Sequence, residues 1–366
     1  MKKNLTLLSL FIVLGIQFAC SSSDSSDAPV VVDPPVVVDD FIRAADISFL
    51  PEIESTGTIL YNNGKAEDML TTLKNAGCNT IRIRLWKNPT SGHSTFTEVK
   101  TLAARVKAAG LKVWLTVHYS DTWADPAAQT TPDEWKNLSF TDLKTAVATY
   151  TSTIITEINP DIIQIGNEIN SGLLWPQGNL INQEAQCIAL LSTASATIRS
   201  KAPKTKIMIH YAGVNASDTD WFFTKVKSVD YDYIGLSYYP IWHGKDLTVV
   251  KTTIDALGSK FSKKVIIAET AYPFTLDYND WTNNIVGSDN QLVSGYSATA
   301  EGQKSYMLAI KSLLKSSKSG IGFSYWGGEW ISFKGNQAKD GSTFENQALY
   351  DFSNKALPVL AVFNLN

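Results

Sequence analysis

Apolar runs of strand length alternate with stretches of helical period from Phe41 onward. A buried parallel strand is expected to be an almost continuous apolar run, and a helix that covers a sheet repeats its apolar positions every three or four residues. The second pattern is clear at Val99, Leu102 and Val106, just before Gly110. The strands predicted on this basis are 43–49, 79–85, 111–118, 161–167, 206–211, 233–238, 265–269 and 320–326. The clearest predicted helices are 65–76, 96–109, 141–158, 184–200 and 301–316.

This order favours an α/β architecture, a single (β/α)8 TIM barrel over residues 41–366, because the strand and helix units follow one another without a break in composition. The alternative is an open, doubly wound sheet. Such sheets carry a glycine-rich phosphate loop, and no segment of this chain has the G-x-G-x-x-G or P-loop spacing. In the expected barrel, functional side chains lie at the carboxyl ends of the strands.

The start of the chain has the composition of a targeting segment. Lys2 and Lys3 precede an apolar stretch, 5–18, that is too short to anchor stably across a bilayer, and a small residue stands before Cys20. The pattern resembles a bacterial lipoprotein signal, 1–19, cut so that Cys20 carries the lipid. Gln17 stands where the usual motif has Leu, and the alternative is a plain secretory signal cut nearby.

Residues 20–40 have no period that would build a core, and we expect a disordered tether there. The acidic serine run after Cys20 resembles the surface-export signal of Bacteroidetes lipoproteins. The expected location is therefore the outer membrane, with the protein lipid-anchored and exposed at the cell surface. A secreted protein is the alternative.

Composition narrows the range of partners. The 366 residues are 44% hydrophobic and 18% charged, with a net charge of −3, which provides neither a basic surface for nucleic acid nor a basic helix for a membrane surface. We expect a monomer without an organic cofactor. Cys78 and Cys187 have no metal-ligand spacing, and two buried thiols are favoured over a disulfide.

Two predicted strands end in carboxylates. The run 161–169 contains Asn167 and Glu168, and the run 264–270 contains Glu269. Taken alone, either glutamate could equally be an ordinary acidic loop residue. Because both stand at strand ends and no cofactor motif lies between them, the pair indicates acid catalysis on one face of the barrel. Further polar and aromatic residues stand at or just past the other strand ends: Asp46, Arg84, Trp86, His118, Asp121, Trp123, His210, Tyr238, Tyr239, Trp326 and Trp330.

Hydrolysis of a glycosidic bond needs two carboxyl groups. One has a raised pKa and protonates the leaving oxygen, while the other stays ionised and attacks the sugar carbon or activates water. The chain also has ten Trp, whose rings match the apolar faces of sugars. Two long connections, 119–137 and 270–299, are expected beside the glutamates.

From about residue 44 to 365, the chain resembles glycoside hydrolase clan A, and within it the arabinogalactan endo-β-1,4-galactanases. The Asn167-Glu168 pair marks the clan, and the run His118-Tyr-Ser-Asp-Thr-Trp-Ala-Asp-Pro126 is more specific for the galactanases. Other markers are the runs ADIS at 45–48, TIRIRLW at 80–86, QIGNEI at 164–169, AETAYP at 268–273 and GFSYWG at 322–327.

The resemblance implies that Glu168 is the general acid/base and Glu269 the nucleophile of a retaining double displacement. Asn167 would bind the hydroxyl next to the attacked carbon. Arg84 and Tyr238 would hold Glu269, with Tyr239 as an equal alternative to Tyr238. The remaining candidate contacts with substrate are Asp46, Asp121, His118 and His210, and the candidate sugar platforms are Trp86, Trp123, Trp326 and Trp330. For each histidine and tryptophan, the alternative is a structural packing role.

Bacterial members of this family hold a structural calcium ion in the loop after the seventh strand, in an Asp-Gly-Asp-Gly-type run. Asp280 and Asn284 fit that pattern, whereas Tyr278 and Thr282 depart from it. Calcium takes about six to eight oxygen ligands, so other loop residues (Asp277 or Asp289) or backbone carbonyls would have to contribute. A solvated acidic loop is the alternative.

The activity implied is endo-hydrolysis of β-1,4-galactosidic bonds in the galactan or arabinogalactan side chains of pectin. A clan A mannanase or β-glucanase would use the same glutamates, but the specific run at 118–126 argues against it. A non-catalytic, glycan-binding surface lipoprotein on the same barrel should have lost a glutamate, and both are present.

Overall fold

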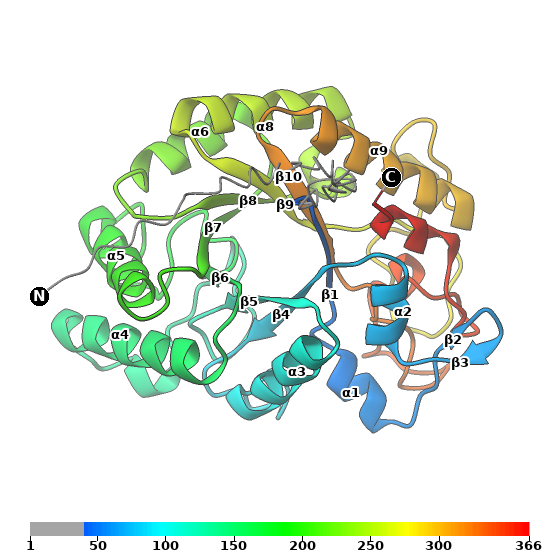
Figure 1. Cartoon of the computed structure of the whole chain (residues 1–366), viewed down its shortest axis with the longest axis horizontal. Helices are drawn as coiled ribbons and strands as arrows, with labels where there is room; N and C mark the ends of the chain where they lie inside the picture. Colours follow the sequence, from blue (N-terminus) through cyan, green and yellow to red (C-terminus); the bar gives the residue numbers. More distant parts are fainter. Residues whose placement is uncertain (1–39, 366) are drawn as a thin grey trace, which may run out of the picture. The chain divides into compact units, whose positions relative to one another are not determined.

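The computed structural model describes residues 40–365, in which eight parallel strands close into a barrel. Helices surround the strands, as Figure 1 shows. Around the barrel the strands follow in the order β1 (Ile42–Asp46), β10 (Gly320–Tyr325), β9 (Lys264–Thr270), β8 (Tyr233–Ser237), β7 (Lys206–Ala212), β6 (Ile162–Ile165), β5 (Lys112–Val117) and β4 (Thr80–Leu85). The (β/α)8 fold and all eight predicted strands are confirmed.

The helices have apolar stripes that pack on the outside of the barrel, and several begin at a polar cap such as Thr95 or Ser139, whose side chain accepts a backbone N–H of the first turn. The α-helices are α1 (Leu50–Ser55), α2 (Met69–Asn75), α3 (Phe96–Ala108), α4 (Phe140–Glu157), α5 (Glu184–Lys201), α6 (Ala216–Lys225), α7 (Pro240–His243), α8 (Leu247–Phe261) and α9 (Ala300–Ser316). Short 3-10 helices lie at η1 (Asp133–Trp135), η2 (Asp289–Gln291), η3 (Glu345–Gln347) and η4 (Pro358–Phe363).

One predicted helix, 65–76, begins later than the apolar pattern indicated. Its first residues form a small hairpin of β2 (Tyr61–Asn62) and β3 (Lys65–Ala66). The turn is Asn63-Gly64, and both residues have positive φ, as a tight hairpin turn requires. Asp68 then caps α2 by accepting the Thr71 backbone N–H.

Apolar side chains fill the barrel interior near the amino ends of the strands. The buried cluster there consists of Ile42, Ala44, Trp114, Ile162, Met208, Ile266 and Ala268. A Cβ at position 235 would lie 2.6 Å from the Met208 sulfur, so Met208 would have to shift to accept any larger residue there. The interior of the barrel is therefore packed near the amino ends of the strands, and the polar side chains of the site lie toward the carboxyl-end face.

Several expectations concern residues 1–39, which lie outside the described residues: the signal 1–19, the lipid on Cys20 and nearly all of the tether. Among residues 40–365, no helix has the length and apolar character needed to cross a membrane. Cys78 and Cys187 are both buried free thiols, as predicted.

Candidate active site

A cleft of about 300 Å³ lies at the carboxyl ends of the barrel strands. Most of the residues singled out in the sequence line it: Asp46, Arg84, His118, Trp123, Asn167, Glu168, Glu269, Trp326 and Trp330. Four others do not: Trp86, Asp121, His210 and Tyr238. The apolar runs thus located the cleft correctly, but not every side chain that faces it.

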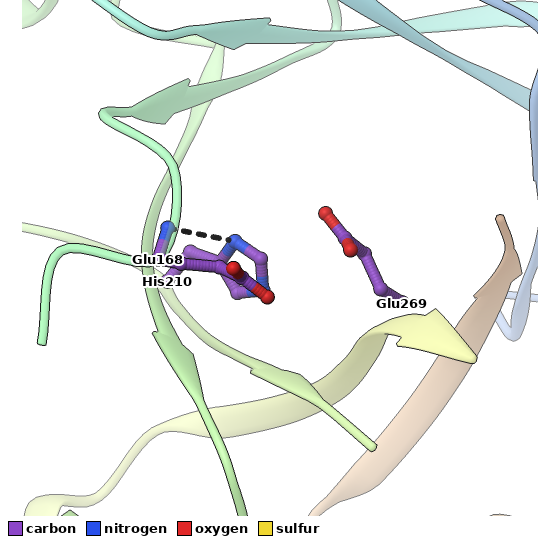
Figure 2. Close-up of side chains that lie close together, drawn as sticks. All are labelled: Glu168, His210 and Glu269. Carbon is purple, nitrogen blue, oxygen red and sulfur yellow. Dashed lines mark hydrogen bonds between the residues drawn. The ribbon is translucent and has the colours of Figure 1, made fainter. Parts of the chain in front are cut away.

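Glu168 and Glu269 meet in the cleft although they come from different parts of the barrel. Glu168 follows β6, and Glu269 lies in β9, three strands farther around. Figure 2 shows both side chains directed toward the same open space. A carboxyl oxygen of Glu168 and a carboxyl oxygen of Glu269 lie within 4.8 Å of each other. Retaining glycosidases place these groups about 5–5.5 Å apart and inverting ones about 6.5–9.5 Å apart, so the spacing matches the retaining class.

The backbone bends sharply where β6 delivers its polar residues. Gly166 has φ +78°, and a Cβ there would lie 2.5 Å from the Ile169 side chain. Glu168 itself has φ +47°, an uncommon value for a residue with a Cβ. Because of this bend, Asn167 and Glu168 both reach the cleft although they are adjacent in the chain.

Asn167 is fixed by its neighbours. Its Oδ1 accepts hydrogen bonds from Arg82 at 2.9 Å and from the Gln164 amide at 3.0 Å. Its Nδ2 donates to the Ala124 carbonyl at 2.9 Å, which leaves one Nδ2 hydrogen for a ligand.

Glu269 is held by a cation and a hydroxyl. The Arg82 guanidinium lies 2.7 Å from its Oε1 and also pairs with Asp46 at 2.6 Å. The Tyr239 hydroxyl donates to Oε2 at 3.0 Å. Burial raises the pKa of Glu269, but both partners stabilise the negative charge and oppose that shift. The contacts with Arg82 and Tyr239 favour the ionised form of Glu269 against the effect of burial.

Within residues 40–365, no cation contacts Glu168 as Arg82 contacts Glu269. Burial, and then the Glu269 charge, raise the pKa of Glu168 to about 8. The Ser237 hydroxyl donates to Oε1 at 2.5 Å and lowers that pKa in part. The raised pKa of Glu168 favours its protonated form, whereas the contact with Arg82 favours the carboxylate of Glu269, and acid catalysis with a nucleophile requires such a difference.

The prediction that Arg84 holds Glu269 is wrong, because Arg82 does so. Side chains alternate along a strand, so both arginines of β4 face the barrel interior. Arg82 is in register with Asp46 and lies one layer deeper. Arg84 lies at the rim instead, with its guanidinium 4.2 Å from the centroid of the Trp123 ring.

Tyr238 is not a partner of Glu269 either, and the alternative, Tyr239, takes that place. Ser237 and Tyr239 are two residues apart and both point inward, so Tyr238 between them points outward. Its hydroxyl donates to the Gly244 carbonyl at 2.9 Å.

Trp86, Asp121 and His210 were expected to contact substrate, but the structure gives them supporting contacts. The Trp86 ring nitrogen donates to His118 Nδ1 at 3.1 Å. Asp121 accepts backbone N–H groups from two loop segments, at 2.9 and 2.8 Å. His210 is fully buried and bonds to Ser237 at 2.9 Å.

Aromatic rings form much of the cleft wall. Trp330 stacks on Phe49 with ring centroids 4.2 Å apart, and Trp123 is 37% exposed. Trp242 also lines the cleft and is 55% exposed. Trp242 is not among the residues predicted from the sequence, because it lies in α7, beyond the strand end, and its Pro240-Ile-Trp242 context carries no strand signal.

The predicted metal site lies in the loop after β9. Asp280 is buried and accepts from the Thr282 backbone N–H and the Ser332 hydroxyl. Asn284 Oδ1 and Glu345 Oε2 are buried and have no hydrogen-bond partner among the described residues. Burial, and then the Asp280 charge, raise the pKa of Glu345. Unpaired buried oxygens beside a carboxylate fit the ligand chemistry of a hard cation such as Ca²⁺.

The fold and the carboxyl pair together define a glycoside hydrolase of the (β/α)8 class. The chain belongs to glycosyl hydrolase family 53, whose sequence model matches residues 42–363.

Known relatives agree over nearly the whole barrel. The arabinogalactan endo-β-1,4-galactanase of Cellvibrio japonicus is 32% identical over 343 residues, covering 88% of this chain and 90% of that protein. Its namesake from Thermothelomyces thermophilus is 33% identical over 337 residues, covering 88% of this chain and 98% of that protein. The solved GH53 catalytic domain of Ignisphaera aggregans has a TM-score of 0.85 at 38% identity, covering 92% of this chain and 99% of that one.

The two tyrosines offer a matched test of the contacts to Glu269. Tyr239→Phe removes a hydroxyl that stabilises ionised Glu269, so the pKa of Glu269 should rise. A hydrogen bond to a charged group contributes about 1.5–3 kcal/mol, so the acidic limb of the kcat/KM profile should move up by about one to two pH units. Tyr238→Phe removes only a bond to a backbone carbonyl and should leave that limb in place. Equal shifts in the two variants would contradict the assignment.

Proposed function

We propose that this protein hydrolyses internal β-1,4-galactosidic bonds in galactan or arabinogalactan, the side chains of pectin, with retention of configuration. The observation that carries the hydrolytic step is the pair of unlike carboxyl groups, Glu168 and Glu269, within 4.8 Å of each other. The choice of substrate is supported by the relatives named arabinogalactan endo-β-1,4-galactanases. It is also supported by the run 118–126, from which Trp123, Ala124 and Asp125 reach the cleft.

In this reaction the Glu269 carboxylate attacks the anomeric carbon while Glu168 gives its proton to the departing glycosidic oxygen. The bond between carbon and that oxygen breaks, and a covalent galactosyl ester forms on Glu269. Glu168, now ionised, takes a proton from a water molecule, whose oxygen attacks the same carbon and releases Glu269. Two displacements at one carbon restore the original configuration.

The residues around Glu269 orient this nucleophile and the sugar that it attacks. Arg82 and Tyr239 fix both oxygens of Glu269, so the nucleophile does not have to be ordered during attack. The remaining Nδ2 hydrogen of Asn167 is available for the sugar hydroxyl next to the attacked carbon. Trp326 and Trp330 provide flat apolar surfaces on which sugar rings stack.

The direct test is the release of reducing ends from β-1,4-galactan, with mannan and β-glucan as parallel substrates. We expect oligosaccharides from galactan alone, with the β-anomer as the first product in a proton NMR time course. Glu269→Gln should abolish release while circular dichroism shows an intact fold. Because Glu168 must be protonated, kcat/KM should fall as the pH rises through about 8. Release from mannan or β-glucan would redirect the substrate assignment, and binding of galactan without release would favour the non-catalytic alternative.

We also propose that Asp280 and Asn284, together with Glu345, hold a structural Ca²⁺. The unpaired oxygens of Asn284 and Glu345 support this. Bound Ca²⁺ would supply a cross-link between the loop after β9 and the segment after β10. Millimolar CaCl₂ should raise the melting temperature by about 5 °C, and EDTA should reverse the increase. Asp280→Asn should lose the response, whereas Asp340→Asn, at an exposed site in the later segment, should keep it. A melting temperature that ignores both additions would exclude the site.

The signal-like pattern at 1–19 supports a lipid anchor on Cys20 and, with the acidic serine run, placement on the outer face of the outer membrane. Metabolic labelling with radioactive palmitate should mark the wild-type protein and not Cys20→Ala, which should be released in soluble form. Protease added to intact cells should degrade the anchored protein. An unlabelled wild-type protein in the culture medium would favour plain secretion.

A further inference from the structure

We propose that His210 and Ser237 form a hydrogen-bonded bridge that orients Glu168 and directs its acid proton to Oε2, so that Ser237 is a positioning residue for the reaction. The inference rests on the proposed role of Glu168 as acid/base and deepens it. It concerns two residues that do not line the cleft.

The bridge begins and ends on Glu168. The Glu168 backbone N–H donates to His210 Nδ1 at 3.3 Å, the bond drawn in Figure 2. On the other side of the ring, His210 Nε2 lies 2.9 Å from the Ser237 hydroxyl oxygen. That hydroxyl in turn donates to Glu168 Oε1 at 2.5 Å. His210 and Ser237 come from neighbouring strands, β7 and β8, and both are fully buried.

The neighbours of His210 determine its tautomer. Nδ1 faces the Glu168 backbone N–H, which donates to it at 3.3 Å. The Gln164 amide nitrogen is 2.9 Å from Nδ1, but its two hydrogens also have the Gly166 carbonyl and the Asn167 oxygen as acceptors, both at 3.0 Å. The third group near Nδ1 is the Asn167 side-chain oxygen, which already accepts from Arg82 and Gln164. Because the Glu168 backbone N–H points at Nδ1, that nitrogen is the acceptor and the ring proton is assigned to Nε2. Burial, and then the Arg82 charge, hold the pKa of His210 well below its usual range, which keeps the ring neutral.

The tautomer fixes the direction of the remaining bonds. Because Nε2–H donates to the Ser237 oxygen, the Ser237 hydroxyl cannot donate to His210. Its hydrogen is therefore donated to Glu168 Oε1. Oε1 then acts as an acceptor, and the carboxylic proton belongs on Oε2. The bridge itself transfers no proton. When Glu168 gives its Oε2 proton to the leaving oxygen, and when it later takes one from water, the Ser237 bond to Oε1 is unchanged.

The bridge also explains how an unusual backbone conformation is kept. Glu168 has φ +47°, which is unfavourable for a residue with a Cβ and persists only where surrounding contacts hold it. One end of the bridge binds the backbone N–H and the other binds the side chain. Main chain and carboxyl group are thereby fixed relative to β7 and β8.

Ser237→Ala removes the hydroxyl and little volume. A donor to the ionised form is lost, so the pKa of Glu168 should rise, and the basic limb of kcat/KM should move to higher pH by about one unit. On galactan, kcat should fall about tenfold, because Oε1 now competes for the proton and the carboxyl group is less well oriented. A nitrophenyl β-galacto-oligosaccharide, whose leaving group needs little protonation, should be affected much less.

Two variants make this result specific. Ser324→Ala removes another buried barrel-strand hydroxyl, one with no hydrogen-bond partner among the described residues, and should leave both readouts unchanged. Ser237→Thr keeps the hydroxyl and should restore the position of the basic limb. Melting temperatures confirm that each variant is folded.

The outcomes separate this inference from the proposed function. If Glu168→Gln cleaves galactan at the wild-type rate, the acid/base assignment itself is wrong. If Glu168→Gln is inactive but Ser237→Ala keeps the wild-type basic limb, the bridge does not tune Glu168 and the inference is overturned. Equal losses on galactan and on the nitrophenyl substrate would also overturn it, because a general structural defect would act on both.

Discussion

The active site depends on one buried guanidinium. Arg82 is 2% exposed and binds Asp46 from β1, Asn167 after β6 and Glu269 in β9. A buried cation is tolerated only where it is paired, and removing one partner of such a pair typically costs about 3–5 kcal/mol. Polar groups from β1, β9 and the segment after β6 therefore converge on the Arg82 guanidinium. The buried apolar cluster of the barrel interior begins next to this guanidinium: the centroid of the Trp114 ring is 5.7 Å from the Arg82 guanidinium carbon.

The regular strand geometry alone would not produce this arrangement. In β9, Ala268 packs in the barrel interior, so a strict two-residue period would turn Glu269 outward. The pairing of β9 with both neighbours contains one extra residue between Ile267 and Thr270, and this bulge brings Glu269 inward. At the end of β6, the positive φ of Gly166 and Glu168 has a similar effect. Both irregularities occur at the carboxyl ends, where the chemistry lies.

The sequence predicts the barrel and its reactive face well because apolar runs and strand-end carboxylates are local signals. It predicts the contacts less well, for identifiable reasons. Arg82 and Arg84 face the same side of β4, and Arg82 lies deeper because it comes earlier in the strand. Only the register between strands shows that Arg82, and not Arg84, is level with Asp46. Tyr238 and Tyr239 are neighbours in the chain, so only one of them can point into the barrel. It is Tyr239 if Ser237, two residues earlier, points inward. The sequence does not show that Ser237 points inward, because this depends on its hydrogen bond with His210 from another strand.

The two glutamates have the same side chain but are suited to different proposed roles, because their hydrogen-bond donors differ in charge. Glu269 is bound by a cation, which favours the carboxylate over the acid. Glu168 is bound by a neutral hydroxyl, itself held by an imidazole that burial keeps neutral. A cation in place of Ser237 would bind Glu168 more tightly, but it would also ionise the group and remove the proton that the leaving oxygen needs. A neutral donor orients the acid without removing its proton, so the difference in charge between the two donors fits the proposed roles, with Glu269 as the nucleophile and Glu168 as the acid.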